Sequence, residues 1–421
     1  MKRVYTRKEV DDIVNRITST IQKGNISKLE EIKKYLIESG LIESDASAIV
    51  KLLSRHLLNN VPMPPVTKLE LNVTENCNLR CDYCFVEEKN PKGMSLTIAK
   101  KSVDFLIRES RHKKDLSILF FGGEPLLEYE TLKETVIYSK KEAKQYDKTI
   151  FFSMTTNGTL LNEERLSFFR DHKVKFLLSI DGNRECHDKH RKTIAGKGTF
   201  DLIKEKIPLI KSYQPWLGAK MTVLPDTTQY LYENIRSLHE EGINQFLFGP
   251  ADGTEWSDKA KTEYGLQLKK VASFYRKEKA KGQPIRINFF EEIESDKFFK
   301  KKPIWGCRAG RQSLSISPDG DIYPCSKMQG IKDLRKIIKL GDLKEGITDS
   351  YLRMRLIGML PVDRAECLQC TYSSSCAGGC FAVNFLEAGD IFKPSPKFEC
   401  GFIALSADFA KNWSSRSQPK R

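Results

Sequence analysis

The stretch LELNVTENCNLRCDYCF, residues 69–85, decides how the rest of the chain is organised. Its first six residues form an apolar run that predicts a β-strand. Three cysteines follow directly, at Cys77, Cys81 and Cys84. A strand that carries thiols on the loop at its end predicts a chemical site at one edge of a sheet.

Three thiolates on one loop have two interpretations. They are one short of the four that complete a 4Fe-4S cluster, so one iron would remain for a substrate or cofactor. The alternative is a zinc site that lacks its fourth ligand. The triplet by itself leaves both open.

From residue 67 onward, short apolar runs alternate with amphipathic stretches, which is the rhythm of a repeated βα unit. The runs expected as strands are LELNVT (69–74), LSILFF (116–121), TIFFSMTT (149–156), KFLLSI (175–180), AKMTVL (219–224) and QFLFG (245–249). Parallel strands with right-handed crossovers follow from this order. The sequence therefore predicts an α/β fold, a partial (βα)6 TIM-like barrel over 67–290, with its chemistry at the carboxyl ends of the strands.

Residues 1–66 are expected to form an N-terminal helical unit that ends at the prolines of VPMPP (61–65). Its apolar residues recur at helical spacing. They are Val10, Ile13, Ile17, Ile21, Leu29, Ile32, Leu36, Leu52, Leu53 and Leu57.

Beyond the barrel we expect a linker at 291–306, a Cys-rich domain at 307–400 and a C-terminal tail at 401–421. The last eight residues of this tail, SSRSQPKR (414–421), are expected to be loose and basic. Within the Cys-rich domain, SLSISPDGDIYPC (313–325) predicts a β-hairpin whose turn contains Gly320.

Composition limits the class of protein. Of the 421 residues, 40% are hydrophobic and 30% charged, as in soluble globular proteins. No apolar run reaches the roughly 18 residues of a membrane span, and MKRVYTRKEVDDIVNR at the start lacks the apolar core of a secretory signal. We therefore expect a cytoplasmic protein without a membrane partner.

The net charge of +15 favours an anionic partner, but basic and acidic residues are interleaved, which argues against a nucleic-acid surface.

The chain has eleven cysteines, and in a reducing compartment these favour metal or cluster ligation over disulfides. Cys186 stands alone and is interpreted as a buried thiol, with a further ligand as the alternative. The seven late cysteines are Cys307, Cys325, Cys367, Cys370, Cys376, Cys380 and Cys400.

Four motifs together resemble the radical S-adenosylmethionine (radical SAM) enzymes: CNLRCDYCF, FGGEPLL (121–127), TTNGTLL (155–161) and LSIDGNRECHDKHR (178–191). The resemblance implies that Cys77, Cys81 and Cys84 bind three irons of a 4Fe-4S cluster while S-adenosyl-L-methionine (SAM) chelates the fourth. Electrons from a low-potential donor of flavodoxin or ferredoxin type would cleave SAM to a 5'-deoxyadenosyl radical, which abstracts a substrate hydrogen.

The same motifs supply the expected cofactor contacts. Gly122 and Gly123 allow a close backbone approach, and Glu124 is expected to accept a hydrogen bond from the cofactor ammonium. Tyr83 is expected to pack near the adenine. By the resemblance, the contacts to ribose, carboxylate and adenine are made by Ser179, Arg191 and Leu224.

The late cysteines, with the internal Gly320, resemble the SPASM domain, an auxiliary-cluster module of radical enzymes that modify peptides and proteins. The resemblance assigns the distal auxiliary 4Fe-4S cluster to Cys367, Cys370, Cys376 and Cys400. It assigns the nearer one to Cys307, Cys325 and Cys380, which makes three clusters in all. A pair of zinc knuckles is the alternative. The nearer cluster has three evident thiolates, so either a non-cysteine group supplies the fourth ligand or an open iron binds a substrate thiolate.

Two activities compete within this resemblance. Peptide maturases install thioether or carbon–carbon crosslinks in a ribosomal precursor peptide, and the basic balance and residues 1–66 would suit an acidic leader. The leader-binding domain usually has a three-stranded ribbon, however, and no clear strands are predicted there. Anaerobic sulfatase-maturing enzymes instead oxidise Cys or Ser to formylglycine, and their cluster motif typically lies near the N-terminus. In many of them an Asp follows the second auxiliary cysteine.

Here about 75 residues precede Cys77, and Ser326 follows Cys325, so we expect a peptide maturase, with sulfatase maturation as the alternative. A non-catalytic iron–sulfur protein would have no use for the glycine-rich motifs. A radical enzyme that modifies nucleic acid is disfavoured by the SPASM spacing.

Overall fold

The computed structural model describes residues 29–38, 40, 46, 49–50, 63–295, 307–358, 364–373, 376 and 378–415. Each of the six predicted strands is present, and its ends agree with the prediction to within one residue. These strands are β1 (Lys68–Thr74), β2 (Asp115–Gly122), β3 (Thr149–Thr156), β4 (Val174–Ser179), β5 (Gly218–Val223) and β6 (Gln245–Pro250). All neighbours in this series pair in parallel, as βα units require.

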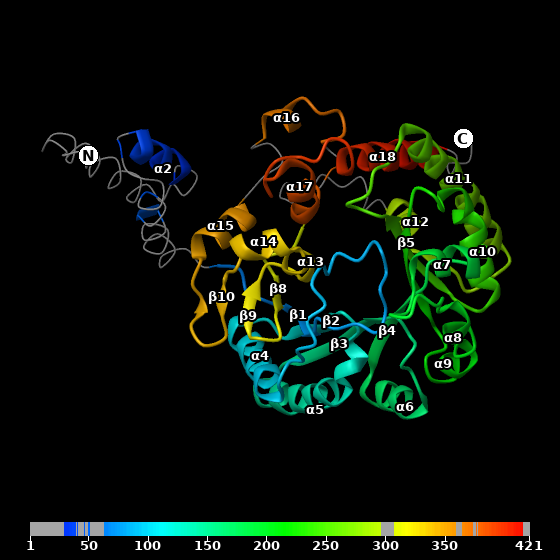
Figure 1. Ribbon diagram of the computed structural model, residues 1–421, viewed down its shortest axis with the longest axis horizontal. Coiled ribbons are helices and arrows are strands. Elements are labelled where there is room, and N and C mark those ends of the chain that lie inside the picture. Colours follow the sequence, from blue (N-terminus) through cyan, green and yellow to red (C-terminus); the bar gives the residue numbers. More distant parts are fainter. Residues whose placement is uncertain are drawn as a thin grey trace, which may run out of the picture.

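Helices cover the outer face of the curved sheet (Figure 1). They are α4 (Leu96–Glu109), α5 (Tyr129–Gln145), α6 (Glu163–His172), α7 (Arg184–His190), α8 (Phe200–Lys204), α9 (Ile207–Tyr213), α10 (Leu231–Glu240) and α11 (Asp258–Ala280). Two 3-10 turns, η2 (Pro125–Glu128) and η3 (Thr228–Tyr230), precede α5 and α10. The partial TIM-like barrel expected from the sequence is confirmed.

Side chains alternate along the strands between the helix layer and the interior of the barrel. On β2, Leu116, Ile118 and Phe120 are at most 1% exposed and belong to the core shared with the helices. Leu119 and Ser153 of β2 and β3 instead line an interior cavity. Because the barrel is incomplete, its interior keeps room for a ligand.

The end of the barrel differs from the prediction. A seventh strand, β7 (Arg286–Ile287), pairs in parallel with β6, and its two residues were too few for a recognisable apolar run. Helix α12 (Asn288–Glu294) occupies the first part of the linker expected at 291–306. Residues 296–306 lie outside the described residues.

The Cys-rich region continues the sheet of the barrel. Strand β8 (Ser313–Ile316) pairs in parallel with the free edge of β1, with Ser313 opposite Lys68. Strand β9 (Asp321–Tyr323) returns antiparallel to β8, which confirms the predicted hairpin, and Gly320 has φ 88° in its turn. With β10 (Gly341–Asp342) and β11 (Gly346–Ile347), the described residues form one sheet in the order β11-β10-β9-β8-β1-β2-β3-β4-β5-β6-β7.

Short helices accompany these strands. They are α13 (Ser326–Gly330), α14 (Lys332–Ile337), α15 (Ser350–Gly358), α16 (Ala365–Leu368) and α17 (Phe381–Ala388). A second apolar core, which includes Met328, Leu334 and Phe381, holds α13, α14 and α17 together, and Cys307, Cys325 and Cys380 pack against it.

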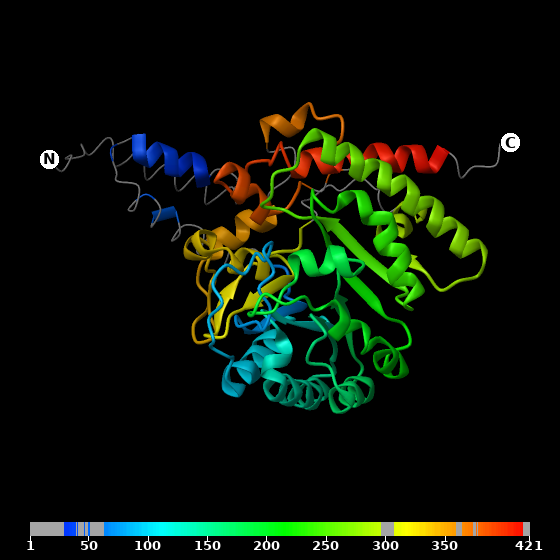
Figure 2. The same cartoon turned by 45° about the vertical axis from the view of Figure 1, so that its right-hand side comes forward.

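Of the expected N-terminal helical unit, the structure describes α2 (Leu29–Glu38), which lies apart from the barrel (Figures 1 and 2). Its residues Ile32 and Leu36 are buried, as their spacing predicts. Seven of the apolar residues expected in helices lie outside the described residues: Val10, Ile13, Ile17, Ile21, Leu52, Leu53 and Leu57.

Most of the C-terminal tail expected at 401–421 belongs to helix α18 (Glu399–Ser415), which packs on the barrel. Of the segment expected to be loose, Ser414 and Ser415 end this helix, and 416–421 lie outside the described residues. Trp413 is 5% exposed, and its ring stacks on Phe290 of α12 at 4.8 Å between centroids. The guanidinium of Arg276 lies 3.7 Å from the same ring. Apolar residues at helical spacing therefore anchor this end of the chain. In the part of the chain that the structure describes, we find no helix with the length and apolar character to span a membrane.

Replacing Trp413 with Ala tests the role of α18. Removal of a buried indole from this stack should destabilise the fold by about 3–5 kcal/mol. The matched change Lys411→Ala, on the exposed side of the same helix, should cost less than about 1 kcal/mol. Urea unfolding followed by tryptophan fluorescence and circular dichroism measures both. Equal midpoints for the two variants would contradict the packing role of α18.

Candidate active site at the carboxyl end of the barrel

A cavity of about 380 Å³ opens where the parallel strands end. It brings together nine of the residues expected at the site. They are Cys77, Cys81, Tyr83, Cys84, Gly122, Gly123, Glu124, Ser179 and Arg191. The four motifs therefore meet in one cavity, as expected for strand ends in a parallel sheet.

Leu224 is the exception among the expected cofactor contacts. It is buried and does not line this cavity, whereas Met221 and Thr222 of β5 do. The reason is that β5 ends at Val223 and the chain then turns, with the Thr227 amide donating to the Leu224 carbonyl at 3.2 Å. The adenine contact of Leu224 stays a prediction.

The three early thiols lie within electrostatic reach of one another on the loop after β1. Burial raises the pKa of Cys81 to about 11, and the charges of Cys84 and Cys77 contribute to this rise while that of Arg191 opposes it. Donors also face the sulfurs: the Leu79 amide lies 3.4 Å from Cys77 Sγ and Lys89 Nζ 2.8 Å from Cys84 Sγ. Thiols with raised pKa values release their protons when a metal binds, and such soft donors suit iron. The donor set therefore fits an iron–sulfur cluster.

Gly122 and Gly123 allow the end of β2 to approach the end of β1. Gly122 has φ 129°, and a Cβ on either glycine would lie 2.0 Å from a carbonyl oxygen, that of Thr74 or Asn76. The Gly123 amide donates to the Thr74 carbonyl at 2.9 Å. A side chain at these positions would push the two strand ends apart and change the cavity wall.

Glu124 is fully buried and joins the ends of β2 and β3. Its carboxylate accepts hydrogen bonds from Thr156 Oγ1 at 2.7 Å, the Asn157 amide at 2.7 Å and the Leu126 amide at 3.1 Å. Burial raises the pKa of Glu124, and these hydrogen bonds oppose that rise. Three of its roughly four acceptor positions are therefore already used, so the expected bond to a cofactor ammonium would depend on the remaining one.

A buried ion pair fixes Arg191. Arg191 Nε and Nη2 donate to the two oxygens of Asp181 at 2.7 and 3.0 Å, and both side chains are at most 8% exposed. The Tyr83 hydroxyl donates to the same carboxylate, and the Thr222 amide donates to it at 2.8 Å. Burial alone would raise the pKa of Asp181, but the Arg191 guanidinium holds it below its usual value.

Sequence reasoning missed Asp181, although it lies within a quoted motif. The signal that could have found it is an acidic residue two positions after Ser179, at a strand end, with an arginine ten positions later. Its structural role is to hold Arg191 and Tyr83 at the cavity wall. Bidentate pairing also leaves Arg191 fewer donors for a ligand.

A charged patch on the cavity wall comprises Lys220 of β5, Asp252 after β6 and Lys327 of α13. Lys327 Nζ forms an ion pair with Asp252, and their side chains are 23% and 25% exposed. Burial lowers the pKa of Lys220, and the charge of Lys327 lowers it further. No sequence motif marks these residues. Because Lys327 follows Cys325 by two positions, the Cys-rich region contributes directly to the cavity.

The late thiols divide into two groups in space. Burial raises the pKa of Cys307 to about 11, with a contribution from the neighbouring Cys380, and both thiols also influence Cys325. Burial likewise raises the pKa of Cys400 to about 11, and its charged neighbours are headed by the thiols Cys376, Cys367 and Cys370. The resemblance to the SPASM domain assigns the same two groups to the nearer and distal clusters, and this ligation stays a prediction. Among the described residues, no three His, Cys, Asp or Glu side chains surround a position for a single metal ion.

Cys186 belongs to neither group. It is 4% exposed on α7, where its amide donates to Asn183 Oδ1 at 3.0 Å in the helix cap. This position agrees with the interpretation of Cys186 as a buried thiol.

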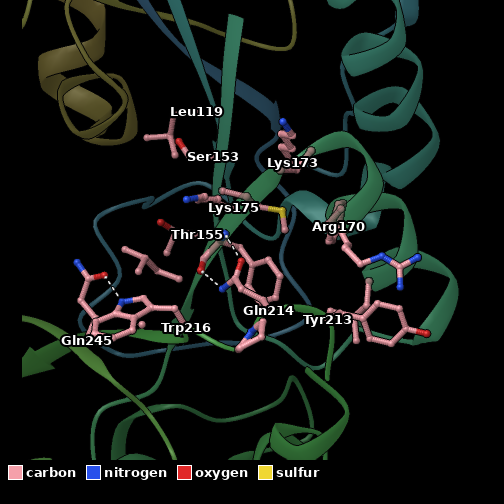
Figure 3. Close-up of a pocket in the computed structure, with 18 of the residues that line it drawn as sticks. Leu119, Ser153, Thr155, Arg170, Lys173, Lys175, Tyr213, Gln214, Trp216 and Gln245 are labelled. Atoms are coloured by element: carbon pink, nitrogen blue, oxygen red, sulfur yellow. Dashed lines mark hydrogen bonds between the residues drawn. The ribbon is translucent and has the colours of Figure 1, made fainter. Parts of the chain in front are cut away.

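A larger cavity, of about 800 Å³, opens at the amino ends of β4, β5 and β6 (Figure 3). Lys175 and Trp216 line it, and Trp216 Nε1 donates to Gln245 Oε1 at 3.2 Å. It contains none of the expected site residues. This cavity opens at the amino ends of the strands and the smaller one at their carboxyl ends, and Thr155 lines both.

Comparison with known proteins agrees with this geometry. The anaerobic sulfatase-maturating enzyme (cysteine type) of Clostridium perfringens (strain 13 / Type A) is 23% identical over 341 residues, which cover 76% of this chain and 89% of that protein. The antilisterial bacteriocin subtilosin biosynthesis protein AlbA of Bacillus subtilis (strain 168) is 26% identical over 346 residues, which cover 78% and 70%.

Two solved structures share the fold. Native anSMEcpe with bound AdoMet and Cp18Cys peptide superposes with a TM-score of 0.68 at 21% identity, over 84% of this chain and 97% of that one. Streptococcus suis SuiB bound to precursor peptide SuiA superposes with a TM-score of 0.55 at 17% identity, over 85% and 79%.

Family models match both parts of the chain. The model of the radical SAM superfamily matches residues 71–238, which contain the four motifs of the cavity. The model of the SPASM iron–sulfur cluster-binding domain matches residues 307–371. Together with the motifs at the strand ends, these matches show that this chain belongs to the radical SAM superfamily of enzymes and carries a SPASM domain.

Proposed function

We propose that this chain is a peptide maturase that acts on a ribosomal precursor peptide and installs a thioether or other crosslink. One observation carries the proposal: a single cavity is lined both by the early thiols and by the charged patch. Lys327 of this patch follows Cys325 by two positions, so the Cys-rich region contributes to the cavity. Charges of both signs beside the strand ends suit the polar groups of a peptide. One named relative belongs to bacteriocin biosynthesis and one structural neighbour holds a precursor peptide, which supports this class. The Clostridium perfringens relative is a sulfatase-maturating enzyme and corresponds to the alternative function.

Ser326 argues against sulfatase maturation. It follows Cys325, is 6% exposed and is not part of the cavity lining. Its amide donates to Glu70 Oε2 at 3.0 Å, and its hydroxyl lies 3.3 Å from that of Ser315. A buried serine hydroxyl in such a network is a poor proton acceptor, so the base expected at this position in many sulfatase-maturing enzymes is missing.

In this proposal Cys77, Cys81 and Cys84 hold the first of three 4Fe-4S clusters. When reduced, that cluster and SAM supply a 5'-deoxyadenosyl radical for hydrogen abstraction. Asp181 keeps Arg191 charged and in a fixed position, from which its remaining donors would bind the cofactor carboxylate, and Tyr83 would form the wall beside it. Gly122, Gly123, Glu124 and Ser179 complete the expected cofactor contacts.

The two auxiliary clusters belong to the late thiols in the groups described above. We assign residues 1–66 to leader binding, 67–290 to the barrel and 307–400 to the auxiliary clusters. Electrons come from a flavodoxin or ferredoxin. A cytoplasmic location fits the eleven cysteines, which are all free thiols.

The first test counts iron. Anaerobically reconstituted chain should hold about twelve irons, by three clusters of four. The variant C77A/C81A/C84A should lose about four of them and all cleavage of SAM to 5'-deoxyadenosine. A Cys186→Ala control should keep the full count. A triple variant that still cleaves SAM would remove the assignment of the first cluster.

The second test concerns the product. Incubated with SAM, reductant and a candidate precursor peptide, the enzyme should yield a peptide lighter by two hydrogen atoms, as crosslink formation requires. A sulfatase-type peptide should yield no formylglycine, because Ser326 replaces the expected base. Mass spectrometry with fragmentation measures both. Catalytic accumulation of the aldehyde would make sulfatase maturation the correct function.

The third test concerns Asp181. Asp181→Asn removes the charge that compensates buried Arg191, so Arg191 and Tyr83 lose their fixed positions. We expect SAM to bind at least about tenfold more weakly, or about 1.4 kcal/mol. Asp147→Asn, which breaks an exposed pair with Lys114, is the control and should change affinity little. Anaerobic equilibrium dialysis measures both. Wild-type affinity in D181N would show that the pair does not shape the SAM site.

A further inference from the structure

The nearer auxiliary cluster has three thiols assigned to it and needs one more ligand. Glu70 is a charged residue in the middle of β1, a strand with parallel neighbours on both edges, where charged side chains are rare. On the same strand Leu69 and Leu71 are fully buried against the helix layer. Glu70 points to the opposite side with 16% of its side chain exposed, so its charge needs a partner there.

The contacts of Glu70 place its carboxylate beside the nearer thiols. Oε2 accepts the amide hydrogen of Ser326 at 3.0 Å, and Ser326 is bonded directly to Cys325. Oε1 lies 3.5 Å from Ser313 Oγ and 3.2 Å from Lys68 Nζ, whose side chain is 38% exposed. The surface lysine is a weak partner, since exposed ion pairs contribute about 0–1 kcal/mol.

Electrostatics agree with this placement. Burial raises the pKa of Cys325, and Glu70 makes the largest contribution of any charged neighbour to that rise. The same carboxylate also raises the pKa of Cys307, after the effects of burial and Cys380. The geometry carries the placement: Cys307, Cys325 and Cys380 pack against one apolar core, and the Glu70 carboxylate is hydrogen-bonded to the residue that follows Cys325.

Glu399 is the other carboxylate near this group, and it is placed differently. It accepts a hydrogen bond from the Cys380 amide, and it also influences Cys376 and Cys400 of the distal group. It is not among the main charged neighbours of Cys307 or Cys325. Glu399 is therefore a neighbour of Cys380 and of the distal thiols, whereas Glu70 is hydrogen-bonded to the residue that follows Cys325.

We propose that the Glu70 carboxylate is the fourth ligand of the nearer auxiliary cluster, beside Cys307, Cys325 and Cys380. The proposal rests on the three-cluster scheme of the proposed function. It makes one iron of this cluster chemically distinct, because a hard oxygen ligand binds iron less tightly than a thiolate does. A substrate thiolate could then displace the carboxylate. The sequence left two alternatives for this iron, a non-cysteine ligand and a substrate thiolate, and both would then apply at different stages.

The test uses the full chain with the C77A/C81A/C84A changes, so that only the auxiliary clusters contribute to the spectra. Glu70→Gln keeps the side-chain volume and an acceptor for the Ser326 amide but removes the anionic ligand. We expect loss of the electron paramagnetic resonance signal of the nearer cluster and of up to about four irons per chain. Glu87→Gln is the matched control, because Glu87 likewise accepts a backbone amide hydrogen, that of Lys332 at 2.8 Å, and it should keep both. An unchanged signal and iron content in E70Q would overturn the proposal.

Two further measurements separate ligation from a purely structural role of Glu70. In Glu70→Cys a thiolate replaces the carboxylate, so iron content should return to the parent value with shifted g values. The parent chain labelled with carbon-13 at its glutamate carboxyls should show a carbon-13 coupling to the reduced nearer cluster by electron–nuclear double resonance. This measurement needs no Glu70 variant, so it holds even if E70Q fails to fold. An absent coupling would overturn the proposal.

None of these readouts uses a peptide, so the ligand and the function are tested separately. A carbon-13 coupling in a chain that never modifies a peptide would leave Glu70 as ligand and remove the maturase proposal. If the wild-type enzyme crosslinks a peptide while the spectra of the E70Q variant are unchanged, the maturase proposal holds and the ligand proposal is overturned. A parent chain that takes up no nearer cluster would overturn the ligand proposal.

Discussion

The parallel pairing of β8 with β1 is the constraint on which the rest of the site depends. It places a strand of the Cys-rich region on the free edge of the first barrel strand, so both regions share one sheet. As a result, the loop that carries Cys77 and the helix that carries Lys327 meet at the same cavity. Strand β1 connects the early thiols to the nearer group of late thiols. The loop at its end carries the early triplet, and Glu70 in its middle is hydrogen-bonded to the residue after Cys325.

Buried carboxylates then hold the strand ends in place. Glu124 joins the end of β2 to that of β3, and Asp181 joins the end of β4 to Thr222 of β5 and to Arg191. Each is satisfied by several donors, which is the condition under which a buried charge can persist. The cavity wall is therefore preorganised by polar contacts that need no ligand. These contacts fix the positions of the residues expected to bind the cofactor.

Much of this arrangement could be predicted from the sequence, because apolar runs and turn residues are local signals. The six strands, the hairpin around Gly320 and the meeting of four motifs follow from such signals. Strand β7 has two residues and the β1–β8 pairing joins distant segments, so neither has a local signature. Helix α18 does have one, because Phe402, Phe409 and Trp413 recur at helical spacing, but the basic end of the chain drew attention away from it. Asp252 and Lys327 form a pair only in three dimensions. Leu224 lies off the cavity lining for a local reason, since the strand ends one residue earlier than expected.

The β1–β8 pairing also has a consequence for how the protein is made. Ser313 follows its partner Lys68 by 245 residues, the difference of 313 and 68. At roughly 5–20 residues per second on the ribosome, one edge of β1 therefore stays unpaired for on the order of 10–50 seconds after it emerges. The early thiols are exposed to the cell throughout this interval, before the strand that completes their surroundings exists. Delivery of iron and sulfide must either wait for the end of translation or proceed on a half-built sheet that is open to aggregation and oxidation.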